Sequence, residues 1–301
     1  QSLSMKDYPR KLFQQFGLTI IDECHHIGAE VFSRALFTVV SKYMLGLSAT
    51  MERKDSLSKV FKMFLGPIVF SKKSDNNADV LVKAIYYSHD DDEFSETDLN
   101  YRGQVHYSKM IKKLCEFNRR TEFILKVLKD TLDNGDKDQQ IMIIAHNKNL
   151  LKYLFEAIEH RKIATVGYYI GGMKEEALKA SENKQVIIAT YAMAEEALDI
   201  KTLTTLIMAT PKTDVRQAVG RILRQKHKQA LVIDIVDQHD IFQRQWNKRR
   251  RYYNKKKYNI ICADVENYKK NKWEDISKKK KFKSVALKKD AFLQGKCMIM
   301  D

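Results

Sequence analysis

Five short apolar segments in the second half of the chain constrain its fold more than any other feature. Each is rich in β-branched and small apolar residues, and stretches with helical periodicity, such as KNLLKYLFEAIEHR, separate them. Strands that alternate with helices predict a parallel sheet with helices on both faces. The five predicted strands are residues 140–147, 166–172, 185–191, 205–210 and 230–237.

A shorter series of apolar segments comes first, at residues 16–22, 43–50 and 80–87. Three strands are too few for a complete doubly wound sheet. We therefore predict an α/β fold with two parallel-sheet domains, the first of them partial. The predicted boundaries are a first domain at 1–88, a linker with helices at 89–134, a second domain at 135–240 and a basic C-terminal extension at 241–301.

Positive charge is concentrated near the C-terminus. Of the net charge of +16, a net +14 falls between Arg244 and Lys289. The segment KRRRYYNKKKY interleaves cations, which suit phosphates, with tyrosines, which suit unstacked bases; the alternative is a solvated lysine-rich tail. The segment has no amphipathic apolar stripe, so we expect no membrane partner. The predicted nucleic-acid contacts in it are Arg249, Arg250, Arg251, Lys255, Lys256 and Lys257.

Four scattered cysteines without a CxxC pair argue against a disulfide framework or a zinc finger and indicate a reducing compartment. The start of the chain has no signal-peptide pattern, and no apolar run is long enough to span a bilayer. We therefore expect an intracellular protein, in the cytoplasm, the nucleus or a viral factory, or packaged in a virion.

The segment IIDECHHIG places two adjacent carboxylates, Asp22 and Glu23, at the end of a predicted strand. Such a pair can divide the work of phosphoryl transfer, since one carboxylate holds Mg²⁺ while the other polarises a water. A zinc site is the rival interpretation. Cys24, His25 and His26 are consecutive, however, and cannot all turn to one metal from a strand end.

A second candidate surface lies on the predicted helix DVRQAVGRILRQ, residues 214–225. Gln217, Arg221 and Arg224 share one face of this helix, beside Gly220. Two arginines and a glutamine next to a glycine suit the recognition of phosphate groups, although a solvated basic face is the alternative. The apolar residues predicted to face the sheet are Val215, Ala218, Val219 and Ile222.

Four segments occur in a telling order: DECH, then SAT about 25 residues later, then ATYAMAEEALDI and QAVGRILR. Together they resemble motifs II, III, V and VI of the superfamily 2 helicases, which are ATP-driven nucleic-acid motors with two RecA-like domains. Longer phrases, such as GLSATMERKDSLSKVFKMFLGPI and ATPKTDVRQAVGRILR, resemble the DEXH helicases of large DNA viruses and phages, relatives of the XPB type. The resemblance extends from residue 1 to about residue 237.

The resemblance implies a role for each matching residue. Asp22 would hold the Mg²⁺ of MgATP through water, Glu23 would position the attacking water, and Arg221 and Arg224 would reach the γ-phosphate as arginine fingers. Thr190 would touch the nucleic-acid backbone. The remaining implied roles are coupling of ATP state to nucleic-acid grip for His25, Ser48, Thr50 and Gln217, and contact with ATP for Asp199 and Gly220.

The sequence departs from the family pattern in two places. Ala197 stands where many relatives have the glycine of Gly-Leu-Asp, which weakens the assignment of Asp199. No GxxxxGK[ST] phosphate-binding loop occurs, and the chain opens on Gln1. We therefore expect that the first half of domain 1 lies outside this sequence, and that this chain alone binds nucleic acid but hydrolyses ATP poorly.

The predicted function is thus that of an ATP-dependent DNA helicase or translocase. The expected cofactors are ATP and Mg²⁺, and the expected partners are nucleic acid, DNA rather than RNA, and the transcription or replication machinery. Two alternatives stay open: a non-catalytic nucleic-acid-binding module whose partner supplies the phosphate loop, and an RNA helicase, because DECH also occurs in RNA motors.

Overall fold

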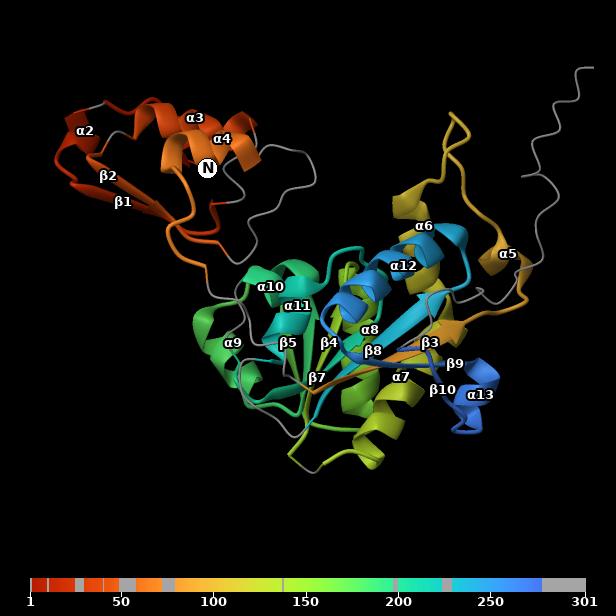
Figure 1. Cartoon of the computed structure of the whole chain (residues 1–301). Coiled ribbons are helices and arrows are strands. Elements are labelled where there is room, and N and C mark those ends of the chain that lie inside the picture. The colour runs from red at the N-terminus through yellow and green to blue at the C-terminus, as the bar shows by residue number, and fades with distance from the viewer. Residues whose placement is uncertain are drawn as a thin grey trace, which may run out of the picture. The chain divides into compact units, whose positions relative to one another are not determined.

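Figure 1 shows the computed structural model of the chain, which divides into two compact units, Gln1–Ser74 and Asp75–Asp301. Each unit is considered by itself. The structure describes residues 2–9, 11–24, 30–39, 41–48, 58–71, 79–136, 138–196, 200–223 and 229–277.

The first unit is built around two short parallel strands, β1 (Leu18–Ile21) and β2 (Tyr43–Gly46). Exposure alternates along both strands, so that Leu18, Ile20 and Tyr43 are 51%, 57% and 60% exposed. This small sheet is therefore covered more fully on one face than on the other. The helices of the unit are α1 (Ser2–Met5), α2 (Lys11–Gln14), α3 (Glu30–Thr38) and α4 (Ser58–Leu65).

The covered face of this sheet is packed tightly around Gly46. A Cβ atom at Gly46 would lie 2.6 Å from Leu65 Cδ1 of α4 and 3.0 Å from Cys24 Sγ. Cys24 is buried, and its amide donates a hydrogen bond to the Leu47 carbonyl at 2.9 Å. Only a glycine lets β2 approach both neighbours this closely.

The second unit contains an eight-stranded sheet in the order β10-β9-β3-β8-β7-β4-β6-β5. The five strands predicted for the second domain lie next to one another in it, all parallel, as β8 (Ala230–Asp237), β7 (Leu203–Met208), β4 (Gln140–Ala145), β6 (Val186–Thr190) and β5 (Val166–Tyr169). The α/β fold with a parallel sheet is confirmed. Their buried, apolar character on both faces is typical of parallel strands.

Three further strands extend the sheet and shift the predicted boundaries. The first of them, β3 (Val80–Tyr87), was expected in the first domain, but it pairs in parallel with β8 from Val80↔Ala230 to Tyr87↔Asp237. β9 (Asn259–Asp264) pairs in parallel with β3, and β10 (Glu274–Asp275) is antiparallel to β9. The predicted first-domain end at residue 88 and the extension from residue 241 therefore both cut through this sheet, because an apolar pattern does not specify which sheet a strand joins.

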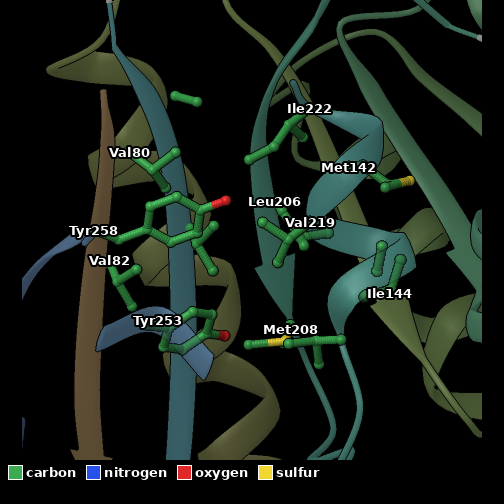
Figure 2. Packing of buried hydrophobic residues seen from close by; sticks show 14 of the residues in the cluster. Val80, Val82, Met142, Ile144, Leu206, Met208, Val219, Ile222, Tyr253 and Tyr258 are labelled. Atoms are coloured by element: carbon green, nitrogen blue, oxygen red, sulfur yellow. The ribbon is translucent and has the colours of Figure 1, made fainter. Parts of the chain in front are cut away.

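Helices cover both faces of the large sheet (Figure 1). One face carries the core cluster drawn in part in Figure 2, in which Val219 of α11 and Tyr253 of α12 lie against Leu206 and Met208 of β7. The helices on this side are α9 (Glu175–Glu182), α10 (Tyr191–Glu196), α11 (Arg216–Arg221) and α12 (Asp240–Lys255).

The opposite face holds a second core cluster, to which the expected linker region contributes. Two of the helices here, α6 and α7, fall within residues 89–134, so this stretch packs on the sheet instead of only connecting domains. α5 (Asp92–Ser95) also adds Phe94 to this cluster. The covering helices are α6 (Tyr107–Glu116), α7 (Asn118–Asp133), α8 (Lys148–His160) and α13 (Val265–Lys269).

Two fully buried ion pairs fasten helices to opposite faces of β8. Asp234 receives two hydrogen bonds from Arg249 of α12, at 2.7 and 2.8 Å, and Asp237 receives two from Arg120 of α7, at 2.5 and 2.9 Å. Asp234 lies within β8, three residues before the end of the strand at Asp237. Removing one partner of such a pair leaves an uncompensated buried charge.

None of the helices in the described ranges has the length and hydropathy that crossing a bilayer requires.

Candidate functional site

The two acidic residues of DECH lie directly after β1 in the first unit. Asp22 is exposed, and its Oδ1 accepts a hydrogen bond from the Glu23 amide at 2.8 Å. Glu23 is half-buried and has a φ of 45°, in the left-handed region that few residues other than glycine adopt. The chain therefore turns sharply at the end of the strand, where parallel-sheet proteins carry their functional groups. An exposed carboxylate oxygen is a ligand that suits Mg²⁺.

Cys24 belongs to the core of the first unit. Its side chain is buried, and burial raises the pKa of its thiol, so the neutral form is favoured over the thiolate that metals require. Cys24 is thus a core residue of this unit, and the zinc interpretation loses its sulfur ligand. His25 and His26 lie outside the described residues.

Ser48 follows β2 at the same edge of the small sheet. The Leu47 amide donates to the Ile21 carbonyl at 2.8 Å, so the two strand ends are held side by side and Ser48 lies near the acidic turn in the same unit. The structure thus brings the residue after β2 and the carboxylates after β1 to one edge. Thr50 lies outside the described residues.

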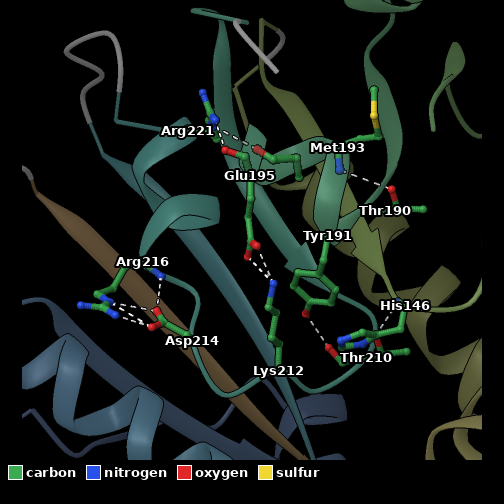
Figure 3. A network of polar contacts seen from close by, with 11 residues as sticks. His146, Thr190, Tyr191, Met193, Glu195, Thr210, Lys212, Asp214, Arg216 and Arg221 are labelled. Atoms are coloured by element: carbon green, nitrogen blue, oxygen red, sulfur yellow. Dashed lines mark hydrogen bonds and ion pairs between the residues drawn. The ribbon is translucent and has the colours of Figure 1, made fainter. Parts of the chain in front are cut away.

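In the second unit, polar residues from three strand ends meet at the carboxyl edge of the large sheet (Figure 3). Thr210, which follows β7, accepts a hydrogen bond from the His146 amide at 3.0 Å and lies 2.9 Å from His146 Nδ1. The Tyr191 hydroxyl donates to the Thr210 carbonyl at 2.5 Å, and its ring lies 4.5 Å from the His146 ring. These contacts tie the ends of β4, β6 and β7 together.

A lysine–glutamate pair that the sequence analysis missed extends this network. Lys212 Nζ lies 2.6 and 2.5 Å from the two carboxylate oxygens of Glu195 and 4.8 Å from the centre of the Tyr191 ring. Although His146 is exposed, partial desolvation of its ring and the charge of Lys212 lower its pKa to about 4. The position of Lys212, four residues after the end of β7, is the signal that would have indicated it.

Thr190 is half-buried, and its Oγ1 accepts a hydrogen bond from the Met193 amide at 3.4 Å. It therefore begins α10 in the manner of a helix cap. This arrangement places Thr190 at the carboxyl end of β6, with its hydroxyl oxygen already engaged in the turn.

The predicted face division of α11 is confirmed on the core side, since all four apolar residues are buried: Val215, Ala218, Val219 and Ile222. Gln217 is half-buried. Gly220 is exposed, and no described atom lies within 4 Å of the position that a Cβ would take there. α11 ends at Arg221, earlier than the predicted end of the helix at residue 225. Arg224 and Asp199 lie outside the described residues.

Arg221 is the best-defined candidate on α11. Its Nε donates to the Ala194 carbonyl at 2.9 Å, and its Nη2 donates to the Glu195 carbonyl. Both carbonyls belong to the last turn of α10, where they have no partner within the helix. The Arg221 guanidinium, from QAVGRILR, therefore binds the backbone of ATYAMAEEALDI. This contact links α10 to α11 (Figure 3).

Two of the six predicted nucleic-acid contacts near the C-terminus are corrected by the structure. Arg249 is buried against Asp234, and Arg250 is buried and donates to the Ile276 carbonyl at 3.3 Å. The interleaved tyrosines are also internal, because Tyr253 and Tyr258 belong to the core. The remaining four predicted contacts are exposed, except for half-buried Lys256: Arg251, Lys255, Lys256 and Lys257.

Comparison with known families divides the chain in the same way as the motifs. Residues 1–53 match the family described as Type III restriction enzyme, res subunit, and residues 121–226 match the Helicase conserved C-terminal domain. The first match contains DECH and SAT, and the second contains ATYAMAEEALDI and QAVGRILR.

Viral proteins are similar over almost the whole chain. A protein of Acanthamoeba polyphaga mimivirus, described as "Putative ATP-dependent RNA helicase L396", is 38% identical over 95% of this chain and 56% of its own length. A protein of African swine fever virus with the same description, QP509L, is 26% identical over 86% of this chain and 54% of its own length. The chain thus spans about half the length of these relatives.

Among solved structures, S. cerevisiae Dbp5 bound to RNA and ADP BeF3 shares the fold, with a TM-score of 0.54 and 13% identity over 87% of this chain and 63% of that one. The fold is thus that of RecA-like helicase domains. The motif positions, the two family matches and the viral relatives together show that this chain belongs to the superfamily 2 helicases and is related to those of large DNA viruses.

Proposed function

We propose that the protein to which this chain belongs is an ATP-driven nucleic-acid motor, a helicase or translocase. The observation that carries the proposal is the agreement between the family matches and the chemistry of the strand ends. Each match contains one half of the residues that phosphoryl transfer needs: carboxylates in residues 1–53, and an arginine in residues 121–226.

In this proposal the first unit supplies the acid–base chemistry. Asp22, exposed at the turn after β1, binds the hydrated Mg²⁺ of MgATP, and Glu23 orients the attacking water. MgATP, when bound, supplies the phosphoanhydride whose hydrolysis drives the motor. Cys24 anchors this turn in the core and keeps the two carboxylates at the strand end.

The second unit supplies the cation. To act as an arginine finger, Arg221 has to release the two α10 carbonyls that it binds in the described structure. If Arg221 left these carbonyls, they would need other hydrogen-bond donors. Contact of α11 with the nucleotide would therefore change the hydrogen bonds at the end of α10. Thr190 begins α10, and this connection would couple ATP state to contact with the nucleic-acid backbone.

The nucleic acid is the finer part of the proposal. The descriptions of L396 and QP509L specify RNA, whereas we expected DNA from the sequence motifs. We propose a motor that grips the phosphate backbone, with Thr190 and the exposed cations Arg251, Lys255 and Lys257 among its contacts. Strand displacement on matched DNA and RNA duplexes distinguishes the two substrates.

MgATP turnover with and without single-stranded nucleic acid tests the motor. We expect stimulated hydrolysis by the mimivirus relative, and loss of at least about 100-fold after the substitution that corresponds to Glu23→Gln. The matched control corresponds to Glu159→Gln, an exposed glutamate at the end of α8. Equal activity of both variants would contradict the role of Glu23.

One observation favours a second candidate function for this chain by itself. The 301 residues contain no GxxxxGK[ST] loop to cradle the phosphates. The alternative is a nucleic-acid-binding module that depends on a loop supplied from elsewhere. The same assay decides, since nucleic-acid binding without measurable turnover supports the module, and stimulated turnover by this chain alone would refute it.

A further inference from the structure

One face of α12 carries a continuous row of cations. Arg244, Lys248, Arg251 and Lys255 are all exposed, and their spacing of four, three and four residues places them along one side of the helix. We call these four residues the α12 row. Two exposed asparagines, Asn247 and Asn254, flank it.

Several lysines on the other surface helices pair with acids, whereas the exposed cations of α12 do not. Elsewhere lysines pair with acids one turn away, as in Lys112–Glu116, Lys126–Asp130 and Lys152–Glu156. Within the described ranges, none of the four side chains of the α12 row forms an ion pair or a hydrogen bond. Like charges one turn apart destabilise a helix, so this arrangement has a cost and no structural return.

The inner face of α12 explains how the row is held. Buried Arg249 pairs with Asp234, while Trp246 and Tyr253 pack in the core on the same side of the sheet. Tyr253 and the buried arginines of the segment therefore face the core, while the α12 row faces solvent. The exposed face retains cations without aromatic rings, which suits phosphates and offers nothing for base stacking.

The row begins near the candidate site. α12 follows β8, so its first turns lie toward the carboxyl edge of the sheet, and Arg249 Nη1 donates to the Lys212 carbonyl at 2.6 Å. Near the start of the helix, Gln245 Nε2 donates to the Tyr107 hydroxyl at 3.3 Å, and that hydroxyl donates to the Pro211 carbonyl at 3.3 Å. α12 is thus tied to the loop that joins β7 to α11.

We propose that the α12 row is a binding surface for the phosphate backbone of nucleic acid, which extends the grip of the motor beyond the carboxyl edge. This inference rests on the proposed function. At 1.5 Å per residue, the row spans about 16 Å, the length of about five phosphate steps along one strand of a duplex. Since it lacks aromatic rings, it contributes affinity without base preference, to duplexes as well as single strands.

The test is the salt dependence of binding to fluorescein-labelled 30-residue DNA and RNA, single-stranded and duplex, measured by anisotropy on the whole chain. One variant carries Arg244→Gln, Lys248→Gln, Arg251→Gln and Lys255→Gln. The matched control removes four exposed lysines that have no described ion pair, through Lys129→Gln, Lys162→Gln, Lys184→Gln and Lys270→Gln. Both lose four positive charges, and thermal unfolding by circular dichroism verifies that both fold.

The logarithm of the binding constant decreases linearly with the logarithm of the salt concentration. We expect this dependence to become shallower, with the magnitude of the slope smaller by about 3 in the α12 variant and by less than about 1 in the control. An equal fall in both variants would overturn the inference and leave the proposed function intact. No binding by the unsubstituted chain at 50 mM salt would refute both. Binding to phosphatidylserine vesicles at the same ionic strength, without binding to nucleic acid, would also overturn the inference.

Discussion

The two units contain the same kind of strand in different surroundings. In the first unit, β1 and β2 alternate between exposed and half-buried residues, whereas β4 of the second unit is buried at every position. Parallel strands with apolar residues on both sides require cover on both faces, and the second unit provides it with helices. The difference shows that apolar strand residues become buried only where neighbouring helices or strands cover them.

The difference in local stability is the largest effect that we expect. Amides in β4 and β7 should be protected from hydrogen exchange by about 5 kcal/mol or more relative to those in β1 and β2. The reason is that a two-stranded sheet with one exposed apolar face gains little from packing. Exchange followed by NMR or mass spectrometry measures both regions in one sample. Similar protection in the two regions would contradict the expected difference in local stability.

The buried ion pairs on β8 test the stability of the second unit directly. Asp234→Ala leaves Arg249 buried and unpaired, so we expect unfolding of the second unit to become easier by about 3–5 kcal/mol. Urea unfolding followed by tryptophan fluorescence reports on this unit through Trp246, which contacts Arg249. The control is Asp240→Ala at an exposed position on α12, which should change stability by less than about 0.5 kcal/mol.

A packing substitution in the first unit gives a smaller effect. Gly46→Ala places a Cβ atom 2.6 Å from Leu65 Cδ1, and we expect a loss of about 1–3 kcal/mol in the stability of that unit alone. Gly17→Ala is the matched control, because no described atom lies within 4 Å of a Cβ at that position. Exchange rates in β1 and β2 provide the measurement. If Gly46→Ala and Gly17→Ala left these rates equal, α4 would not pack on β2 as described.

The smallest expected effect is a pH dependence in the second unit. Burial lowers the pKa of His239, whose Nε2 lies 2.6 Å from the Phe94 carbonyl oxygen. The unfolded chain therefore binds a proton more readily than the folded one. The stability that neutral His239 contributes is complete above the unfolded pKa of about 6.5, and is lost as the pH falls below it.

Urea unfolding between pH 7.5 and pH 5 measures this dependence. His239→Gln should flatten the fall in stability toward acid, whereas His160→Gln, at an exposed position, should leave it unchanged. A profile that is identical in the protein and in His239→Gln would assign the acid sensitivity to other groups.

The helix face of QAVGRILR and the core position of Cys24 were predictable, because both follow from local periodicity and residue size. The Lys212–Glu195 pair and the contact of Arg221 with α10 were not, since the partners lie 17 and 26 or 27 residues apart. Contacts of that kind depend on how strand ends converge. The four motifs indicated the family, whereas the arrangement of their side chains came from the fold.

By itself, the sequence determined the α/β class, the strands of the second sheet and the residue types of the candidate site, because these depend on short-range patterns of apolar and charged residues. Only the tertiary structure decided that β3 joins β8, and that Arg249 and Arg250 are buried while Arg251 is exposed. Neighbouring arginines in one helix point in different directions, and the sheet beneath α12 selects which of them lose contact with water.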